Sequence, residues 1–243
     1  MTSSVDTATR WRTIETGEPQ SLAKARTLTL NIVQWLARMA NSYVAERTPE
    51  GRVLLEFRAA NTAFVTKTFE NGHALEMRLP SLEMQFLENG QPAPHILDPE
   101  EHSPAEAEAW LLVELLHRNI DRSKFTKRLP YSVPDLMSGD ADDYSPLKCQ
   151  QGLAQLAAWF QNAAAVLEAA AGGKTKIVCS PRTLILSFAS KAAELGFSSG
   201  DGQHAEPFFY KGAPNGSGKT LTASSLLAQT DPAAAALRFL TAG

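Results

Sequence analysis

The sequence predicts an α+β fold, with antiparallel sheets packed against long helices in two similarly organised halves. Residues 22–46 and 147–171 carry apolar side chains at every third or fourth position, which is the spacing of one face of a helix. Segments that follow each stretch alternate apolar and polar residues with a period of two, as antiparallel strands with one wet face do. Because a helix followed by strands occurs twice, we predict two α+β halves that can form one domain.

The first half contains three alternating segments, at residues 53–57, 75–79 and 82–86. An Asn-Gly pair at 71–72 precedes the second segment and favours the positive φ angles of a tight hairpin turn. The alternation changes parity at the Pro-Ser pair 80–81, which predicts a bulge or a tight connection there. These segments should therefore form an antiparallel meander.

Other segments of the first half are predicted from composition. A second Asn-Gly pair, at 89–90, ends the meander, and the Pro-rich residues 91–102 are predicted to form a loop. Residues 125–133 are predicted as one more strand. The acidic segment 138–143 is the predicted linker between the halves. It does not fit a calcium-binding loop, because Gln151 stands where such a loop has a glutamate.

Two helices begin with residues that cap helix ends. Ser103, Pro104 and Glu106 supply an N-cap side chain, a proline at the first helical position and the reciprocal acceptor of a capping box. Asp231 and Pro232 start a short terminal helix in the same way. Between these two helices, three segments are predicted as strands, at 176–179, 183–190 and 206–211.

These elements divide the chain into four parts. Residues 1–20 are predicted as a flexible arm, 21–137 as the first half, 146–212 as the second half, and 213–243 as a flexible loop with a short terminal helix. A hydrophobic content of 44% is enough for a substantial core, which we expect the two halves to share.

Composition excludes several classes of function. The net charge is −3, so no positive field attracts nucleic acid or anionic lipid. No apolar run reaches the ~20 residues of a membrane span, and the N-terminal residues lack the apolar core of a signal peptide. Cys149 and Cys179 show neither a zinc spacing nor a disulfide framework. We therefore predict a cytoplasmic protein with reduced thiols that binds neither nucleic acid nor membrane.

The histidines and serines form no recognised catalytic or metal-binding spacing. The five histidines lack the paired spacing of a zinc site, and no serine stands in the elbow motif of serine hydrolases. We therefore predict no metal and no cofactor. A small-ligand-binding or interaction protein without established catalysis is the favoured function.

Nucleotide binding is the alternative function, because residues 213–220 approximate the phosphate-binding loop of ATPases and GTPases with alanine at the first glycine position. The candidate phosphate-binding residues are Gly216, Gly218, Lys219 and Thr220. Only one acidic residue follows this segment, and the preceding strands alternate as antiparallel strands do. A magnesium-binding acid on a neighbouring parallel strand is therefore not expected, and an accidental match is the favoured interpretation.

The most unusual stretch of the chain is residues 195–210, which brings together glycines, ionisable groups and three aromatic residues. Loops of this composition often carry binding sites, although the same pattern fits a hairpin loop whose aromatic residues lie in the core. We predict a ligand pocket near five residues, namely Arg182, Asp201, His204, Glu206 and Tyr210.

Each of these five residues has a predicted role. Asp201 and Glu206 would accept hydrogen bonds, Arg182 would hold an anion, and Tyr210 would form a wall of the pocket. A hydrolase that uses His204 and Glu206 as an acid–base pair is a third hypothesis, ranked last. It depends on the two side chains sharing one face of an extended segment.

The same stretch resembles a known family. "GFSSGDGQHAEPFFY" is similar to the G-x-S-P-G-D…E-P-Y-F-Y signature of a bacterial family of uncharacterised proteins, catalogued as a domain of unknown function. Five residues match its pattern, namely Gly200, Asp201, Glu206, Pro207 and Tyr210. Weaker matches occur at Asn-Ser-Tyr 41–43 and at residues 129–134. The resemblance spans residues 20–212 and implies a fold unit with a pocket, without an agreed activity.

Two departures from the family pattern bear on chemistry. The family shows a W-P-H-H-F-D-like segment after its second helix, whereas residues 179–184 here read CSPRTL and lack the histidines and the acid. The family's histidine- and tryptophan-containing tail is replaced by the segment that resembles a phosphate-binding loop. Any reaction that depends on those family groups is therefore not expected in this chain.

Overall fold

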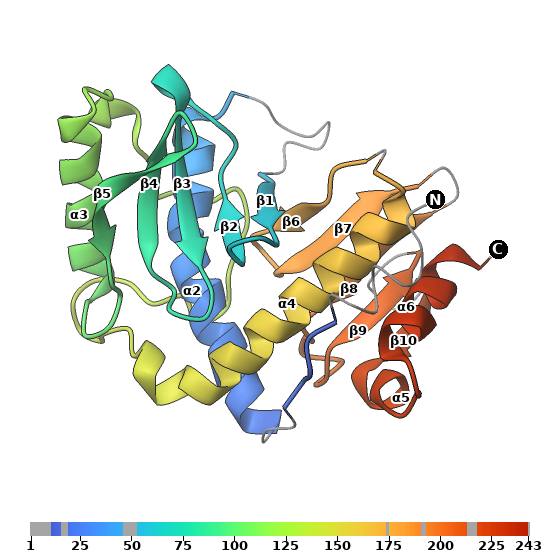
Figure 1. The fold of residues 1–243 in the computed structure, drawn as a ribbon. Helices are drawn as coiled ribbons and strands as arrows, with labels where there is room; N and C mark the ends of the chain where they lie inside the picture. The colour runs from blue at the N-terminus through green and yellow to red at the C-terminus, as the bar shows by residue number, and fades with distance from the viewer. Residues whose placement is uncertain are drawn as a thin grey trace.

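The computed structural model describes residues 11–15, 19–45, 53–173, 175–190, 193–212 and 218–242, which form one antiparallel sheet with helices against it (Figure 1). The helices are α2 (Pro19–Tyr43), α3 (Pro104–His117), α4 (Gln150–Ala171), α5 (Ala223–Leu227) and α6 (Pro232–Thr241). The strands are β1 (Leu55–Arg58), β2 (Ala63–Val65), β3 (His73–Arg78), β4 (Met84–Glu88), β5 (Gln91–Leu97), β6 (Val178–Ser180), β7 (Ile185–Ala189), β8 (Glu194–Ser198), β9 (Phe208–Lys211) and β10 (Lys219–Thr222). The predicted α+β class is confirmed.

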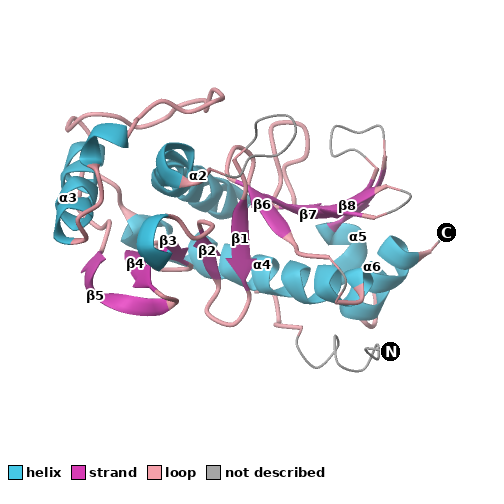
Figure 2. Cartoon of the chain, turned by 90° about the horizontal axis from the view of Figure 1, so that it is seen from above, coloured by secondary structure: helices cyan, strands magenta, loops and turns pink. Residues whose placement is uncertain are grey.

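The sheet consists of two runs of consecutive strands that meet at its centre. Its order is β10-β9-β8-β7-β6-β1-β2-β3-β4-β5, so β5 and β10 are the two edge strands. The runs join where Leu55 of β1 pairs with Cys179 of β6. The sheet twists along its length, and β1 is foreshortened in Figure 1 but extended in Figure 2.

One hydrophobic core joins the two runs of strands. Phe160 of α4 has its ring centroid 5.5 Å from that of Phe57, 5.1 Å from that of Phe64 and 5.8 Å from that of Phe197. The first two rings belong to the first run and the third belongs to the second run. Aromatic packing around α4 therefore links strands from both parts of the chain.

Helices α2 and α4 approach each other closely at a glycine. A Cβ added to Gly152 of α4 would lie 2.3 Å from the carbonyl oxygen of Ser21 and 2.9 Å from the Cβ of Ala25, both on α2. The position thus has no room for a side chain. Small residues allow the two helix backbones to pack directly against each other.

Part of the predicted N-terminal arm lies against α4. The backbone N–H of Arg12 donates to Oδ1 of Asn162 over 2.7 Å, and Nδ2 of Asn162 donates back to the Arg12 carbonyl over 2.9 Å. The ring of Trp11 meets that of Trp159 edge-on, with centroids 6.3 Å apart. Residues 11–15 are therefore held to the helix, while the rest of residues 1–18 lies outside the described residues.

The predicted helix starts are confirmed. The Glu106 N–H donates to Ser103 Oγ over 3.2 Å, and the Ser103 N–H donates to Glu106 Oε2 over 2.8 Å, so the capping box closes in both directions. Asp231 caps α6 by accepting the N–H of Ala234 over 2.9 Å. The local sequence is therefore sufficient to start α3 and α6.

The first Asn-Gly pair adopts the backbone geometry predicted for it, whereas the prediction that the second pair ends the meander is wrong, because another antiparallel strand follows it. Asn71 and Gly72 have φ angles of 58° and 79°, and Asn89 and Gly90 have φ angles of 51° and 81°. The first pair lies in the connection from β2 to β3, and the second joins β4 to β5. The Pro-Ser pair 80–81 lies in a tight connection between β3 and β4, as one of the two predicted alternatives required.

The loop predicted for residues 91–102 is wrong over its first part, because Gln91–Leu97 forms β5. Two prolines, Pro92 and Pro94, suggested a loop because proline cannot donate a hydrogen bond to a neighbouring strand. β5 is an edge strand that pairs with β4 alone, and an edge strand tolerates missing donors on its open side. The tertiary position of the strand therefore overrides the proline signal.

The strand predicted at residues 125–133 is also wrong. This segment is irregular, and its backbone is hydrogen-bonded to side chains of α2. Thr126 N–H donates to Ser42 Oγ over 2.9 Å, and Arg38 Nε donates to the Lys127 carbonyl over 3.2 Å. Backbone groups that are satisfied in this way do not need a neighbouring strand.

Besides β5, three strands were not predicted. β2 is buried on both faces and consists of Ala, Phe and Val, so it shows no alternation of apolar and polar side chains. β8 does alternate, with apolar side chains at Leu195 and Phe197, but it overlaps residues 195–210, which were interpreted as a loop. β10 falls in the segment predicted as a flexible loop with a terminal helix, and the described part of that segment holds β10, α5 and α6. Among the described residues, no helix has the length and apolar character that a membrane crossing requires.

Candidate functional site

The loop between β8 and β9 is folded by Asp201. Its Oδ1 accepts the backbone N–H of Gln203 over 2.8 Å and that of His204 over 2.7 Å. The Asp201 N–H in turn donates to the His204 carbonyl over 2.7 Å. Asp201 is therefore engaged in shaping the loop, in place of the predicted role as a hydrogen-bond acceptor for a ligand.

The same loop requires glycine at its start. Gly200 has a φ angle of 102°, and a Cβ there would lie 2.4 Å from Nη1 of Arg26. This guanidinium nitrogen donates to the Ser199 carbonyl over 3.1 Å. Burial lowers the pKa of Arg26, although the neighbouring carboxylate of Asp201 acts in the opposite direction. The loop thus packs directly onto α2.

A cavity of about 540 Å³ lies beside this loop and includes two of the predicted site residues, His204 and Glu206, in its wall. Its apolar wall comes from α2, α4, α5 and the chain before α2, and includes Ile14, Leu22, Trp159 and Leu227. A volume of this size is typical of sites for small organic molecules.

Glu206 ties the loop to α5. Its carboxylate accepts the backbone N–H of Ser224 over 2.7 Å and the Ser224 hydroxyl over 2.9 Å. The Ala223 N–H donates to the Pro207 carbonyl over 2.8 Å. These bonds hold one wall of the cavity in place, and they engage both carboxylate oxygens of Glu206.

Two polar atoms of residues in the cavity wall are buried without a hydrogen-bond partner. They are Oε1 of Gln155 and Nδ1 of His204. His204 Nδ1 lies 3.4 Å from Asp201 Oδ1, which is within reach of an ion pair but does not make a hydrogen bond. Most buried polar atoms in proteins have a partner, so two such atoms at one cavity indicate a place where a ligand can supply one.

The other three predicted residues do not line this cavity, since Asp201 shapes the loop and Tyr210 and Arg182 lie elsewhere. Tyr210 is buried in β9 over Gly196, and its hydroxyl donates to Glu194 Oε1 over 2.7 Å. Burial raises the pKa of Tyr210, and the hydrogen bond to Glu194 raises it further. Arg182 is exposed in the turn between β6 and β7. Neither residue is among those that line the cavity.

Two of the four candidate phosphate-binding residues, Lys219 and Thr220, lie in a strand. Lys219 pairs with Lys211 and Thr220 pairs with Tyr210 in the antiparallel ladder between β10 and β9. Gly218 directly precedes β10, and Gly216 lies outside the described residues. In a phosphate-binding loop, the lysine and threonine begin a helix whose N–H groups face the phosphates, and that arrangement is not found among the described residues here.

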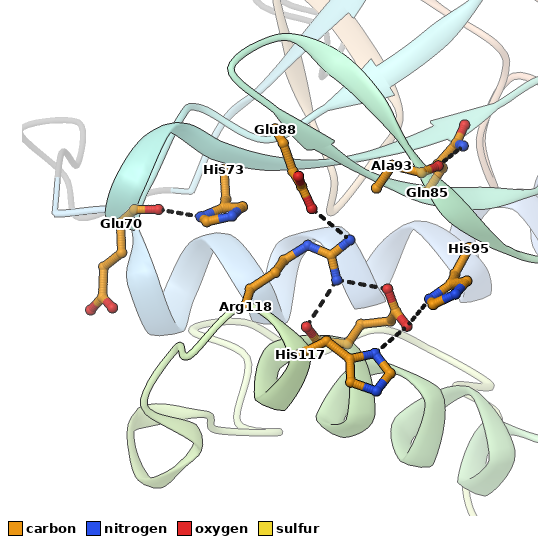
Figure 3. A network of polar contacts seen from close by, with 9 residues as sticks. Glu70, His73, Gln85, Glu88, Ala93, His95, His117 and Arg118 are labelled. Atoms are coloured by element: carbon orange, nitrogen blue, oxygen red, sulfur yellow. Dashed lines mark hydrogen bonds and ion pairs between the residues drawn. The ribbon is translucent and has the colours of Figure 1, made fainter.

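A cluster of ionisable side chains that was not predicted from the sequence lies between α3 and β5, which is at the other end of the sheet from β10. Figure 3 shows His95, His117 and Arg118 of this region. His95 reaches it from β5, and Glu114 and His117 reach it from α3. Nδ1 of His95 lies 2.9 Å from Glu114 Oε1, and Nδ1 of His117 lies 3.3 Å from the same oxygen. The Glu-x-x-His spacing on α3 was a usable signal, because residues three apart share one face of a helix.

Arg118 holds the second oxygen of Glu114. Its Nη1 lies 2.6 Å from Glu114 Oε2, and its Nη2 lies 3.1 Å from Oε1 of Glu88. Burial alone raises the pKa of Glu114, but the hydrogen bonds from Arg118 and His95 outweigh it and hold this pKa below its ordinary value. Glu114 is therefore a buried carboxylate in its charged form.

A larger hollow of about 990 Å³ lies between the β1–β2 turn and α4. Charged residues, among them Arg58 and Glu168, form part of its wall. None of the buried polar atoms that lack a partner in the described chain belongs to this wall. A ligand in this hollow would therefore find fewer unpartnered polar atoms than a ligand in the cavity beside the β8–β9 loop.

Comparison with models of known protein families, with curated proteins and with solved structures finds no match for this chain.

Proposed function

We propose that the chain is a binding module for a small, mainly apolar molecule, which occupies the cavity beside the β8–β9 loop. The observation that carries the proposal is the combination of an apolar wall with the unpartnered buried oxygen of Gln155. A ligand N–H or O–H group would satisfy that oxygen. The apolar body of the ligand would lie against Trp159 and the leucines of the wall.

The polar groups of the cavity narrow the class of ligand. Gln155 Oε1 accepts hydrogen bonds and cannot donate, so it selects a ligand with a donor. The carboxylate of Glu206 is engaged by Ser224, so it is not available to bind a cationic ligand without breaking those bonds. A flat, uncharged aromatic molecule with one N–H or O–H group fits these constraints best.

Binding without catalysis is part of this proposal. Among the described residues, no hydrogen bond or ion pair joins His204 to Glu206, so the acid–base pair of a hydrolase is not assembled. Asp201 is likewise engaged by the loop backbone. No observation favours the nucleotide alternative, because Lys219 and Thr220 pair within the sheet.

The organisation and setting of the protein belong to the same proposal. Each run of five strands follows a long helix, α2 or α4, which supports two similarly organised halves. Cys149 and Cys179 are both free, which fits a reducing compartment, and we place the protein in the cytoplasm. We also propose that the chain is related to the bacterial family with the Gly-Asp…Glu-Pro signature.

A pair of matched probes tests the ligand class. Indole carries an N–H donor and 1-methylindole does not, while the two are otherwise nearly the same size. Thermal unfolding is measured with each probe, because a ligand that binds the folded state raises the melting temperature. The expected result is a larger rise with indole than with 1-methylindole.

The Gln155→Leu variant identifies the atom responsible. Removing an unsatisfied buried oxygen should raise the stability of the free protein by about 1 kcal/mol and abolish the preference for indole. Gln151→Leu, an exposed position one turn earlier on α4, is the matched control and should keep that preference. The proposal fails if neither probe raises the melting temperature at millimolar concentration, or if the preference persists in Gln155→Leu.

A further inference from the structure

The cluster on β5 and α3 has the ligand types of a transition-metal site. We propose that His95, Glu114 and His117 bind one divalent transition-metal ion, with Zn²⁺ as the ion that suits them best. Two imidazoles and one carboxylate form a ligand set common to zinc and other first-row metals, whereas Mg²⁺ and Ca²⁺ prefer oxygen ligands throughout.

The ligand atoms already lie at the spacing of a coordination sphere. Nδ1 of His95 and Nδ1 of His117 lie 2.9 Å and 3.3 Å from Glu114 Oε1. The three residues each offer one ligand atom within 4.8 Å of the other two. Ligand atoms about 2.0–2.1 Å from a tetrahedral Zn²⁺ are separated by about 3.3 Å. Small side-chain adjustments would therefore place an ion between the three atoms.

Glu114 is oriented for this role by Arg118. The Arg118 side chain is only 6% exposed, its guanidinium lies 4.4 Å from the centre of the Phe86 ring, and it binds Oε2 of Glu114. Oε1 is thereby directed toward the two imidazoles. A partner that holds the second oxygen of a ligating carboxylate is the usual outer support of a metal site.

The electrostatics of the cluster also favour a cation. Arg118 faces two carboxylates, Glu114 and Glu88, so its single positive charge leaves one negative charge uncompensated in this network. Neutral imidazoles add no charge and can ligate through Nδ1 with the proton on Nε2, so a bound ion would replace the hydrogen bond from His95 Nδ1 to Glu114. An added divalent ion therefore meets a net negative environment in spite of the nearby guanidinium.

The exposed fractions of the three side chains indicate whether the cluster would form an open or a closed metal site. The Glu114 side chain is 3% exposed, whereas those of His95 and His117 are 57% and 52% exposed. The carboxylate thus forms the floor, and the two rings form a rim that an ion can reach from solvent. Three protein ligands with an open side leave coordination positions for water or an exogenous ligand, unlike closed four-ligand structural zinc sites.

Zinc titration of the full chain by calorimetry tests this proposal, with Zn²⁺ alone as the probe. We expect one Zn²⁺ ion per chain. Loss of an outer-shell partner alone costs about 10–100-fold in metal affinity, so His95→Ala and His117→Ala should each weaken binding by at least about tenfold. The histidine variants are the primary test, because Glu114 is buried against Arg118 and its replacement affects folding.

Two variants control for other zinc-binding groups. His102→Ala removes a histidine outside the cluster, whose Nδ1 lies 2.9 Å from the Glu100 carbonyl. Cys149→Ser removes the partly exposed thiol. Both should bind Zn²⁺ like the unmodified chain. The proposal is overturned if no stoichiometric binding is seen, if the double variant His95→Ala/His117→Ala binds as well as the unmodified chain, or if His102→Ala or Cys149→Ser weakens binding as much as the cluster variants.

Discussion

The ionisable groups at the two ends of the sheet differ in their hydrogen-bond partners. At the β8–β9 loop, Asp201 and Glu206 bind the backbone of their own surroundings, and the adjoining cavity is mainly apolar. At the β5–α3 end, Glu114 keeps one oxygen directed at two half-exposed imidazoles. A residue's chemical type therefore does not reveal its role, because the role depends on which hydrogen bonds the fold has already used.

This difference suggests that one end binds by apolar contact and the other by charge. At the cavity end, Trp159 is 2% exposed and stacks on Phe197 with ring centroids 6.0 Å apart. At the β5–α3 end, Arg118 forms ion pairs with two carboxylates, those of Glu88 and Glu114. Variants at matched positions at the two ends of the sheet test this difference.

The largest effect is expected for Trp159→Ala. Removing a buried tryptophan costs about 3–5 kcal/mol of unfolding free energy, which urea denaturation measures. The variant should also lose the stabilisation by indole, because it removes part of the cavity wall. Trp110→Ala, at the other end beside Phe86, should cost less and leave indole binding unchanged. Equal losses of indole binding in the two variants would contradict the comparison.

A somewhat smaller effect is expected for Arg118→Met. It leaves the buried carboxylate of Glu114 without its guanidinium, and breaking such a pair costs about 3 kcal/mol. Arg26→Met at the cavity end removes a single hydrogen bond to the Ser199 carbonyl, so about 1 kcal/mol is expected there. Urea denaturation of both variants gives the two values, and a larger loss for Arg26→Met would reverse the assignment of charge to the β5–α3 end.

The smallest effect concerns the acid response of α3. Hydrogen bonds from the backbone and side chain of Ser103 lower the pKa of Glu106 below its ordinary value of 4.5. A carboxylate with a lowered folded-state pKa stabilises the protein above its unfolded-state pKa, and this stabilisation is lost as pH falls through the folded-state pKa. Glu106→Gln should therefore be less stable than the unmodified chain near neutral pH, with a gap that narrows in acid.

Melting temperatures measured from about pH 7 down to about pH 3 follow that gap. A gap that stays constant across the range would show that Glu106 does not contribute through its charge. Asp231 caps α6, beside the cavity end of the sheet, by accepting the Ala234 N–H. The Asp231→Asn variant therefore allows the same measurement on a helix cap at the other end of the sheet.

Interactions between near neighbours in the chain were predictable. The helix starts at Ser103 and Asp231 and the turn at Asn71 and Gly72 are present as expected. Each depends on atoms a few residues apart, so the sequence contains all the partners. The predicted site was only partly predictable for the opposite reason. His204 and Glu206 line a cavity, but its apolar wall comes from α2, α4 and α5.

The metal-type cluster shows the same limit. His117 and Glu114 are three residues apart, so their pairing could have been predicted from the sequence. His95 lies on a strand that was predicted as a loop because of its prolines. Only the position of β5 at the sheet edge, beside α3, brings the third ligand into place.

The start of α3, the start of α6, the turn at Asn71 and Gly72 and the packing of helices on an antiparallel sheet all followed from the amino-acid sequence. The tertiary structure alone decided that residues 125–133 bond to α2, that Gln91–Leu97 is a strand, and that Gln155 Oε1 has no partner. The physical reason is that every buried polar group needs a hydrogen bond. Local sequence names the group, whereas the packing of distant elements determines which partner, if any, it finds.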